Sequence, residues 1–499
     1  MLKSWQSHQE YKAFLHEAKV HFDPSLRHRL FSFSDIRAKL ISLNLDPVME
    51  FISSLYSDGG RPAENQAQIL RSFVLFCLLR SAKLICCGLT KWASSVLPGD
   101  PVFCALVGCS CDNLPPVGSY YDFMNRLWLF NDRSRYSRAK TFPSAKNRKK
   151  PDKPKGKGQK APDHAGIISR IVPYLINGGG IPFNFESILQ DILLIAAVRP
   201  SMAKGLIPMD GLTVSGDGTC VHVHASPFGH RLRSCPYRST CADFENCPRH
   251  FSDPDASIGW DSDLNDYFFG YNLYNISVYN PSASVDLPIL VRYTDARRHD
   301  SVNGIVALYE LGKHAPDIKI ENLCLDSAND NYPTYELCKH WNIKPFIDLN
   351  KRTGRPESIP ERINIDTDGT PICNAGHRMV FWGYDRCKHA MKWRSPCVLG
   401  KCERCDSPCS KSPYGRTVYT KTDWDIRLYT PVARGTEEWK RIYNNRTSTE
   451  RINNRILNNY GLHGMHIHGK DHYSFFTMII CICIHLDAWH KCKKTNSAE

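Results

Sequence analysis

Alternating hydrophobic and polar residues mark strands in the middle of the chain, and apolar residues spaced three or four apart mark helices between them. The predicted order is three strands, a helix, a strand, a helix and a strand. These elements cover residues 212–224, 271–279, 287–293, 302–313, 318–325, 332–340 and 344–349. Strands and helices mixed in this order predict an α/β fold in which helices flank a mixed sheet.

The N-terminal part, residues 1–135, has helical spacing instead. Residues 63–85 carry apolar side chains at helical intervals, and shorter helical segments follow at 91–97 and 120–129. Short helices joined by Gly and Pro turns are typical of modules that bind DNA ends, and they fit a packing or dimerisation domain nearly as well. We therefore expect an all-helical N-terminal domain with one of these roles.

A basic segment, residues 136–165, separates these helices from the first part of the predicted α/β core at 166–350. Ten Lys and Arg residues between Arg138 and Lys160 face one acid, Asp152, and Pro and Gly are interspersed. This composition predicts a flexible or extended linker. Lys149 and Lys150 at its centre are candidates for contacts with DNA phosphates. A solvated tether is the alternative interpretation.

The α/β pattern also breaks down at residues 351–438, which are rich in Cys, Arg, Lys, Gly and Pro. We interpret this stretch as an insertion into the core, which resumes at 439–499. The longest apolar run, residues 475–486, is too short to span a bilayer, which needs about 20 residues. It predicts a buried helix or strand.

The chain returns to the core through a predicted helix at residues 443–457. At about 100° per residue, Tyr443, Arg446, Glu450 and Leu457 fall within about 60° of one another. A neighbouring apolar stripe is formed by Ile442, Ile452 and Ile456. One stripe therefore anchors the helix, and the other presents a phenol, a guanidinium and a carboxylate in a row.

The net charge and the cysteine content limit the kinds of partner and the cellular compartment that we expect. The net charge of +14 favours an anionic partner, with nucleic acid first. No secretory signal is visible, so we expect a cytoplasmic protein whose 21 cysteines are reduced. Two cysteine clusters have the spacing of metal ligands. They are Cys235, Cys241 and Cys247 with His250, and Cys397, Cys402, Cys405 and Cys409. The second is the better candidate for a structural zinc site, with free thiols as the alternative.

Three acids are candidate ligands for Mg²⁺ or Mn²⁺. Asp217 and Asp326 follow predicted strands, and Glu450 lies on the 443–457 helix. Hard carboxylates suit these cations, which also bind phosphate oxygens. The rival acids are Asp210, Asp330, Glu437 and Glu438. We prefer the first set because alternation continues past Asp217, Asp330 lies in a loop, and the two rival glutamates lack Tyr and Arg at matching spacing.

With the Tyr443-x2-Arg446-x3-Glu450 spacing, these residues resemble the DDE transposases of bacterial insertion sequences, in the group marked by a Tyr-x2-Arg-x3-Glu-x6-Lys signature. The resemblance covers about residues 205–350 and 435–490, and 61–129 resembles the helical N-terminal region of such enzymes. It implies an RNase H-like core that uses divalent metal to cleave and join DNA. The signature's Lys is replaced here by Leu457.

Matched residue by residue to the motif of this family, the resemblance implies that Asp217, Asp326 and Glu450 form the catalytic triad and hold the metal. Arg446 would contact a phosphate, Tyr443 would help to hold the strand, and Arg451 or Arg455 would replace the missing Lys. The partners implied are double-stranded DNA, as terminal inverted repeats and target, and a second copy of the chain. A catalytically inactive DNA-binding protein and a metal-dependent nuclease without strand transfer remain alternatives.

Overall fold

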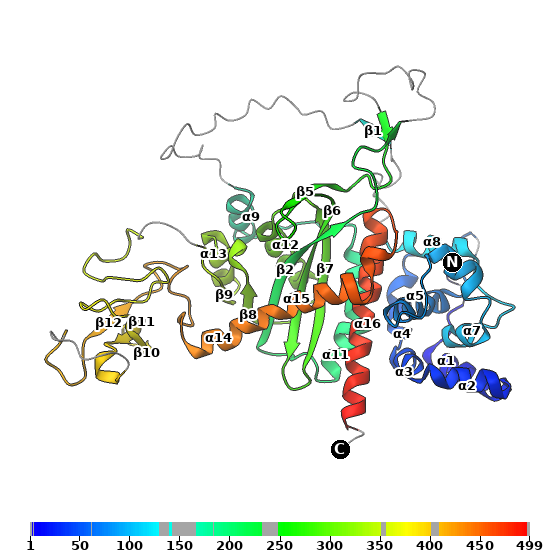
Figure 1. Ribbon diagram of the computed structural model, residues 1–499, viewed down its shortest axis with the longest axis horizontal. Helices are drawn as coiled ribbons and strands as arrows, with labels where there is room; N and C mark the ends of the chain where they lie inside the picture. The colour runs from blue at the N-terminus through cyan, green and yellow to red at the C-terminus, as the bar shows by residue number, and fades with distance from the viewer. Residues whose placement is uncertain are drawn as a thin grey trace.

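The computed structural model describes residues 2, 4–60, 62–128, 139–141, 166–182, 184–231, 248–350, 356–400 and 409–496. At its centre a mixed six-stranded sheet is flanked by helices, which is the mixed α/β class expected (Figure 1). The strands are β2 (Leu212–His222), β5 (Ser257–Asp261), β6 (Asp266–Asn280), β7 (Val285–Asp295), β8 (Ile320–Leu325) and β9 (Lys344–Ile347).

The sheet changes from antiparallel to parallel at β2. On one side of β2 the order is β6 and then β7, all antiparallel, and β5 pairs with the first residues of β6. On the other side β8 and then β9 run parallel to β2. Parallel neighbours need a crossover between them, and α12 (Asp300–His314) and α13 (Tyr332–His340) lie in the connections that lead to β8 and β9.

Helices cover both faces of the sheet. One face carries a nearly continuous helical run: α14 (Glu437–Tyr443), a 3-10 turn (Asn444–Arg446), α15 (Thr447–Asn454) and a π turn (Arg455–Asn459). It is held by hydrogen bonds from the Ser215 hydroxyl to the Asn445 carbonyl, 2.9 Å, and between the Ser277 and Ser448 hydroxyls, 2.8 Å. The predicted apolar stripe is confirmed for Ile452 and Ile456, which are fully buried. The other face carries α12.

One hydrophobic core joins the sheet to the N-terminal helices. The predicted apolar run belongs to α16 (Lys470–Asn496), which packs against β7 on one side and α3, α5 and α8 on the other (Figure 1). Among the described residues α16 is the one helix long and apolar enough to cross a membrane, but 78% of its most apolar window is buried inside the protein. It is therefore the core helix of this fold.

The N-terminal helices are α1 (His8–His21), α2 (Pro24–Ser32), α3 (Ser34–Ser42), α4 (Asp46–Ser53), α5 (Gln66–Ser81), α6 (Leu89–Lys91), α7 (Pro101–Val107) and α8 (Val117–Arg126). Side chains of α5 are buried all round the helix, and they include the polar residues Gln66, Gln68, Arg71 and Ser72. Between this region and β2 lie α9 (Ile167–Ile176), α10 (Ser187–Leu193) and α11 (Arg199–Ala203).

The stretch between β9 and α14 contains a second sheet, which its sequence pattern does not predict. The antiparallel strands β10 (Val380–Asp385), β11 (Ala390–Arg394) and β12 (Thr417–Thr420) cover a separate small core. A buried ion pair between Arg427 and Asp330, 2.6 Å long, ties this part to the end of β8. The sheet is built from Trp, Met and Tyr at alternate positions rather than from aliphatic runs.

The described residues of the basic linker are 139–141, and they form a strand. There β1 (Ala139–Thr141) pairs with β4 (Pro248–His250), which also pairs with β3 (His230–Arg231). An extended conformation was one of the two expected for this segment. Lys149 and Lys150 lie outside the described residues.

Candidate active site

Two of the predicted catalytic acids are brought together by strand register. Ser215 of β2 lies opposite Cys324 of the parallel strand β8. Two residues further along, Asp217 and Asp326 therefore occupy neighbouring positions on adjacent strands. The expectation that Asp217 follows a short strand is wrong, because β2 continues to His222 and Asp217 lies in its middle. Asp326 does follow its strand directly, with extended backbone.

Both carboxylates are on the face that the α14–α15 run covers. Side chains two residues apart on a strand share a face. Ser215 donates to the Asn445 carbonyl, and the Cys324 thiol contacts the Ile442 carbonyl at 3.3 Å. Asp217 and Asp326 follow these two residues by two positions each. The segment that carries Tyr443, Arg446 and Glu450 thus lies directly against the strands that carry the two acids.

Glu450 is oriented by an arginine. Arg446 Nη2 lies 2.7 Å from Glu450 Oε1, one helical turn away, and the Glu450 side chain is 49% exposed. Burial disfavours the charge on Arg446, but Glu450, Tyr443 and Asp217 outweigh it and raise the pKa of the guanidinium. Arg446 therefore contacts Glu450 directly and also interacts electrostatically with Asp217.

Tyr443 lies near a further acid, Asp348. Leu325 of β8 pairs with Ile347 of β9, so the next residues, Asp326 and Asp348, are also neighbours. Burial first, and then the charge of Asp348, raises the pKa of Tyr443 to about 12. The Tyr443 ring stacks on Trp439 at 4.6 Å between ring centroids. The phenol thus stays protonated at neutral pH and is held rigidly beside the strand ends.

Asp217 has an unusual affinity for protons. Burial raises its pKa to about 7, and the charges of Asp326 and Asp300 contribute in the same direction. Arg446 and the Gly218 N–H, which donates to Asp217 Oδ1 at 3.0 Å, act against this rise. Carboxylates gathered with too little positive charge favour protons or cations, so this group of acids is suited to a divalent cation.

Asp300 is a neighbouring acid, on the α12 side of the sheet, that the sequence patterns did not identify. It begins α12, and it contacts Gly218, the residue after Asp217. Asn272 Nδ2 donates to Asp300 Oδ1 at 2.7 Å. The one signal in the sequence was an acid just before a helix that follows β7, which is as common in ordinary helix starts as in active sites.

The two arginines expected to replace the missing Lys have acidic partners elsewhere. Arg451 forms a two-point contact with Asp286, at 2.6 and 2.7 Å, and Arg455 contacts Asp487 at 2.6 Å. Leu457 is 8% exposed and belongs to the main core. The expected polar row on the helix therefore ends at Glu450, and Leu457 is buried within the π turn at Arg455–Asn459.

The rival acids lie outside this group or have other roles. Asp210 is exposed in the turn before β2, and Glu437 and Glu438 are exposed at the start of α14. Asp330 is fully buried and paired with Arg427. These surroundings favour Asp217 and Asp326 over their neighbours in the sequence.

The zinc hypotheses concern residues that are mostly outside the described part of the chain. Cys402 and Cys405 of one cluster and Cys235, Cys241 and Cys247 of the other are not described. Cys397 and Cys409 are described and partly exposed. Both zinc sites stay predictions.

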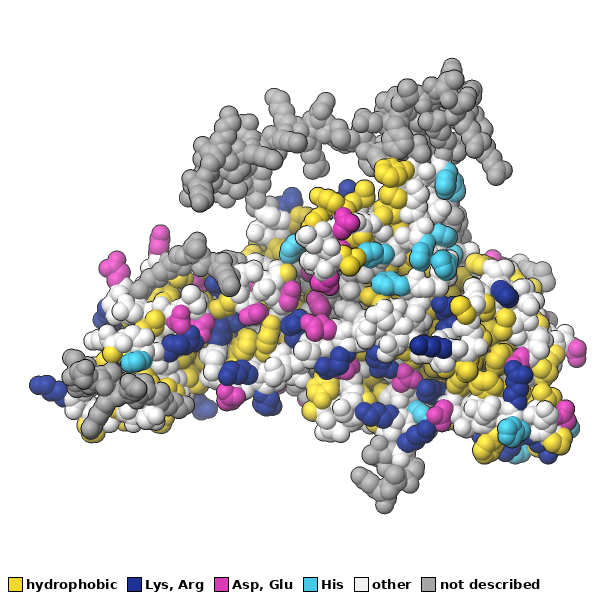
Figure 2. All heavy atoms as spheres, viewed as in Figure 1, with side chains coloured by type: hydrophobic (Ala, Val, Ile, Leu, Met, Phe, Trp, Pro, Cys, Tyr) yellow, Lys and Arg dark blue, Asp and Glu magenta, His cyan; other side chains and the backbone are white. Residues whose placement is uncertain are grey.

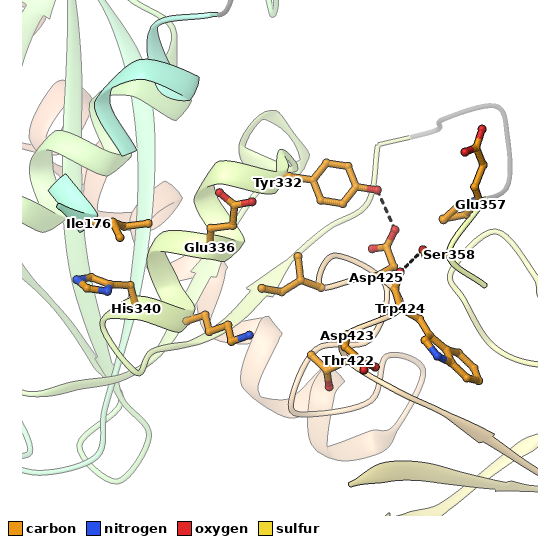
Figure 3. Close-up of a pocket in the computed structure, with 13 residues that line it drawn as sticks. Ile176, Tyr332, Glu336, His340, Glu357, Ser358, Thr422, Asp423, Trp424 and Asp425 are labelled. Carbon is orange, nitrogen blue, oxygen red and sulfur yellow. Dashed lines mark hydrogen bonds between the residues drawn. The ribbon is translucent and has the colours of Figure 1, made fainter. Parts of the chain in front are cut away.

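Two hollows lie near the site. One, of about 1040 Å³, is lined by Gly218, Asn272, Asp300 and Leu457 together with His222 and His463. Figure 2 shows His side chains gathered on the viewed face near the upper end of α16. The other, of about 990 Å³, lies between α13 and the insertion, where the Tyr332 hydroxyl donates to Asp425 at 2.8 Å (Figure 3). The first adjoins Asp300, and the second adjoins none of Asp217, Asp300, Asp326 and Glu450.

The donor set fits Mg²⁺ or Mn²⁺ better than zinc. Among the described residues, no three His, Cys, Asp or Glu side chains form a ready-made metal cage. Mg²⁺ is usually held by one or two carboxylates plus water and substrate phosphates. The adjacent carboxylates of Asp217 and Asp326, with the raised pKa of Asp217, meet that requirement.

A scan against models of protein families finds no match to the chain. A search of curated proteins finds no relative of significant similarity. A functional assignment therefore has to come from the chain's own side chains and their geometry.

Proposed function

We propose that the protein is a DDE-type transposase that cleaves the inverted-repeat ends of an insertion sequence and joins them to target DNA. The observation that carries the proposal is the β2–β8 register, which sets Asp217 beside Asp326 under the helical segment with Arg446. The net charge of +14 supports a DNA partner. The strand order β7–β6–β2–β8–β9, antiparallel and then parallel, supports an RNase H-like core.

In this mechanism Asp217 and Asp326 would hold Mg²⁺ or Mn²⁺. Bound divalent cations supply such a site with an activated water or 3′-hydroxyl and with charge for the leaving oxygen. Arg446 binds a phosphate of the cleaved strand, and Tyr443 positions that strand by its rigid phenol. Glu450, which pairs with Arg446 in this structure, would be the third carboxylate available to the cation.

The full chain is tested with Mg²⁺ on DNA that carries the sequences flanking its coding region. We expect nicking at the element ends and joined products, in a complex of two protein chains on paired ends. Asp326→Asn should abolish both reactions and leave DNA binding intact. Full cleavage by Asp326→Asn would remove the proposal.

The Arg446–Glu450 pair and Leu457 favour one second candidate, a DNA-binding protein that has lost its chemistry. DNA binding that is independent of metal and gives no turnover would support it. Hydrolysis without any joined product would instead indicate a nuclease. The assay therefore separates the three functions by their products.

A further inference from the structure

Two unsatisfied groups lie on the α12 side of the sheet, next to the candidate site. The Oδ1 atom of Asn272 and the hydroxyl of Tyr274 are buried without a hydrogen-bond partner among the described residues. Asn272 is 9% exposed and Tyr274 is fully buried. A buried polar atom without a partner costs about 1–3 kcal/mol, so their position needs an explanation.

The orientation of the Asn272 amide is fixed by Asp300. Its Nδ2 atom donates to the Asp300 carboxylate at 2.7 Å, which identifies its Oδ1 atom as the acceptor that has no partner among the described residues. That oxygen would lie 3.0 Å from a side-chain carbon on Gly218, and the same carbon would overlap Asp300 Oδ1. Two oxygens, one of them charged, therefore converge above a residue that has no side chain.

Asp217 is the residue before Gly218, and its charge is felt by the same groups. Burial, and then the charges of Asp217, Asp300 and Asp326, raise the pKa of Tyr274 well above its ordinary value. The buried hydroxyl of Tyr274 thus remains a hydrogen-bond donor among these carboxylates. The space above Gly218 opens into the 1040 Å³ hollow, which Gly218, Asn272 and Asp300 line.

We propose that the Asp300 carboxylate and the Asn272 amide oxygen form a divalent-cation position at Gly218, on the face of the sheet opposite Asp217, entered from this hollow. Carboxylate and amide oxygens are hard ligands that suit Mg²⁺ and Mn²⁺, with water completing the shell. Gly218 is required because any side chain there would displace Asp300. The inference deepens the proposed function and rests on it for the choice of cation. It makes Asp300 and Asn272 cation ligands in addition to the proposed triad of Asp217, Asp326 and Glu450.

The experiment titrates the full, metal-free chain with Mn²⁺ and measures free Mn²⁺ by electron paramagnetic resonance, without DNA. Asp300→Asn should lose one bound Mn²⁺ per chain, or raise the Kd at least tenfold, and Gly218→Ala should do the same. The matched controls are Gly312→Ala, an open position on α12, and Asp317→Asn, a half-exposed acid paired with Arg199. Both controls should bind Mn²⁺ like the unmodified protein.

Unchanged Mn²⁺ binding by Asp300→Asn, with a loss in Asp326→Asn, would overturn the inference and leave the proposed function in place. A loss in Asp300→Asn in a protein that never cleaves DNA would support the inference and count against the function. No Mn²⁺ binding by the unmodified chain at millimolar concentration would overturn the inference outright. Metal-free melting temperatures show whether each variant is folded, and Asp300→Asn should melt no lower than the unmodified protein.

Discussion

Arg446 and Glu450 form an ion pair of 2.7 Å across one helical turn, directly over the strands that carry Asp217 and Asp326. In the proposed function, this pair would hold a cation-binding acid and a phosphate-binding base together while neither has its partner. Each would be released by one component of the reaction: the arginine by DNA phosphate and the glutamate by metal. The contact therefore couples the two binding events.

Substitution Arg446→Gln should reduce metal-dependent DNA cleavage at least tenfold while changing the free energy of unfolding by less than about 1 kcal/mol, because partly exposed pairs add little stability. Cleavage assays and urea unfolding measure the two effects. Lys440→Gln, which breaks the exposed pair with Glu437, is the matched control and should alter neither. Equal cleavage by both variants would contradict a role for Arg446.

Asp217 makes the stability of the metal-free protein depend on pH. Its pKa is about 7 in the folded chain, against 3.8 ordinarily, because burial and neighbouring acids disfavour its charge. The folded state therefore keeps a proton that the unfolded state releases. We expect the contribution of this group to the free energy of unfolding to fall as pH rises from about 4 to about 7, and to stay low above that.

Urea unfolding between pH 4 and 9, without metal, measures this dependence. In the Asp217→Asn variant, the free energy of unfolding should fall less as pH rises. At pH 8 the variant should be more stable than the unmodified protein. Addition of Mg²⁺ at pH 8 should stabilise the unmodified chain and not the variant. A variant with the same pH profile as the unmodified chain would show that Asp217 is not the titrating group.

Removal of the buried pair between the core and the insertion should be costly. Arg427→Ala leaves Asp330 charged and fully buried, so we expect a loss of about 3–5 kcal/mol in the free energy of unfolding. Lys344→Ala, which breaks a half-exposed pair with Glu321, should cost less than about 1 kcal/mol. Chemical denaturation compares the two, and similar small losses would mean that Asp330 is hydrated.

Restoring the lysine of the transposase signature should destabilise this chain. Leu457 is buried in the main core, so Leu457→Lys loses the burial of an apolar side chain, worth about 1.5–3 kcal/mol. Leu457→Met, which conserves volume, should cost less than about 1.5 kcal/mol. A thermal melt measures both. A Lys variant as stable as the Met variant would show that the side chain reaches water through the adjoining hollow.

Local periodicity was sufficient to predict most of the sheet. The strands β2, β6, β7, β8 and β9 and the helices α12 and α13 lie where alternation and helical spacing predicted them, because each has one clearly apolar face or a buried run. The small sheet of the insertion was missed, since its strands rely on aromatic and cationic side chains. The spacing of aliphatic residues therefore did not reveal this small sheet.

The candidate site was only partly predictable, for a different reason. Asp217 and Asp326 stood out because each accompanies a recognisable strand. Asp300 and Asn272 lie elsewhere in the sequence. Asn272 comes near Gly218 because β6 pairs with β2, and Asp300 comes near it at the start of α12. Arg446 and Leu457 lie in local irregularities, a 3-10 turn and a π turn, that helical spacing alone did not predict. Such irregularities follow from packing rather than from propensity.

The position of α16 has a consequence for how the molecule assembles. The Cys483 thiol contacts the Val74 carbonyl across 409 positions of sequence, and Lys494 contacts Asp35 across 459. Contacts this distant must close a very long loop before they contribute any stability. Refolding should therefore be slow, with the helices near the start of the chain exposing apolar surface until the last helix arrives.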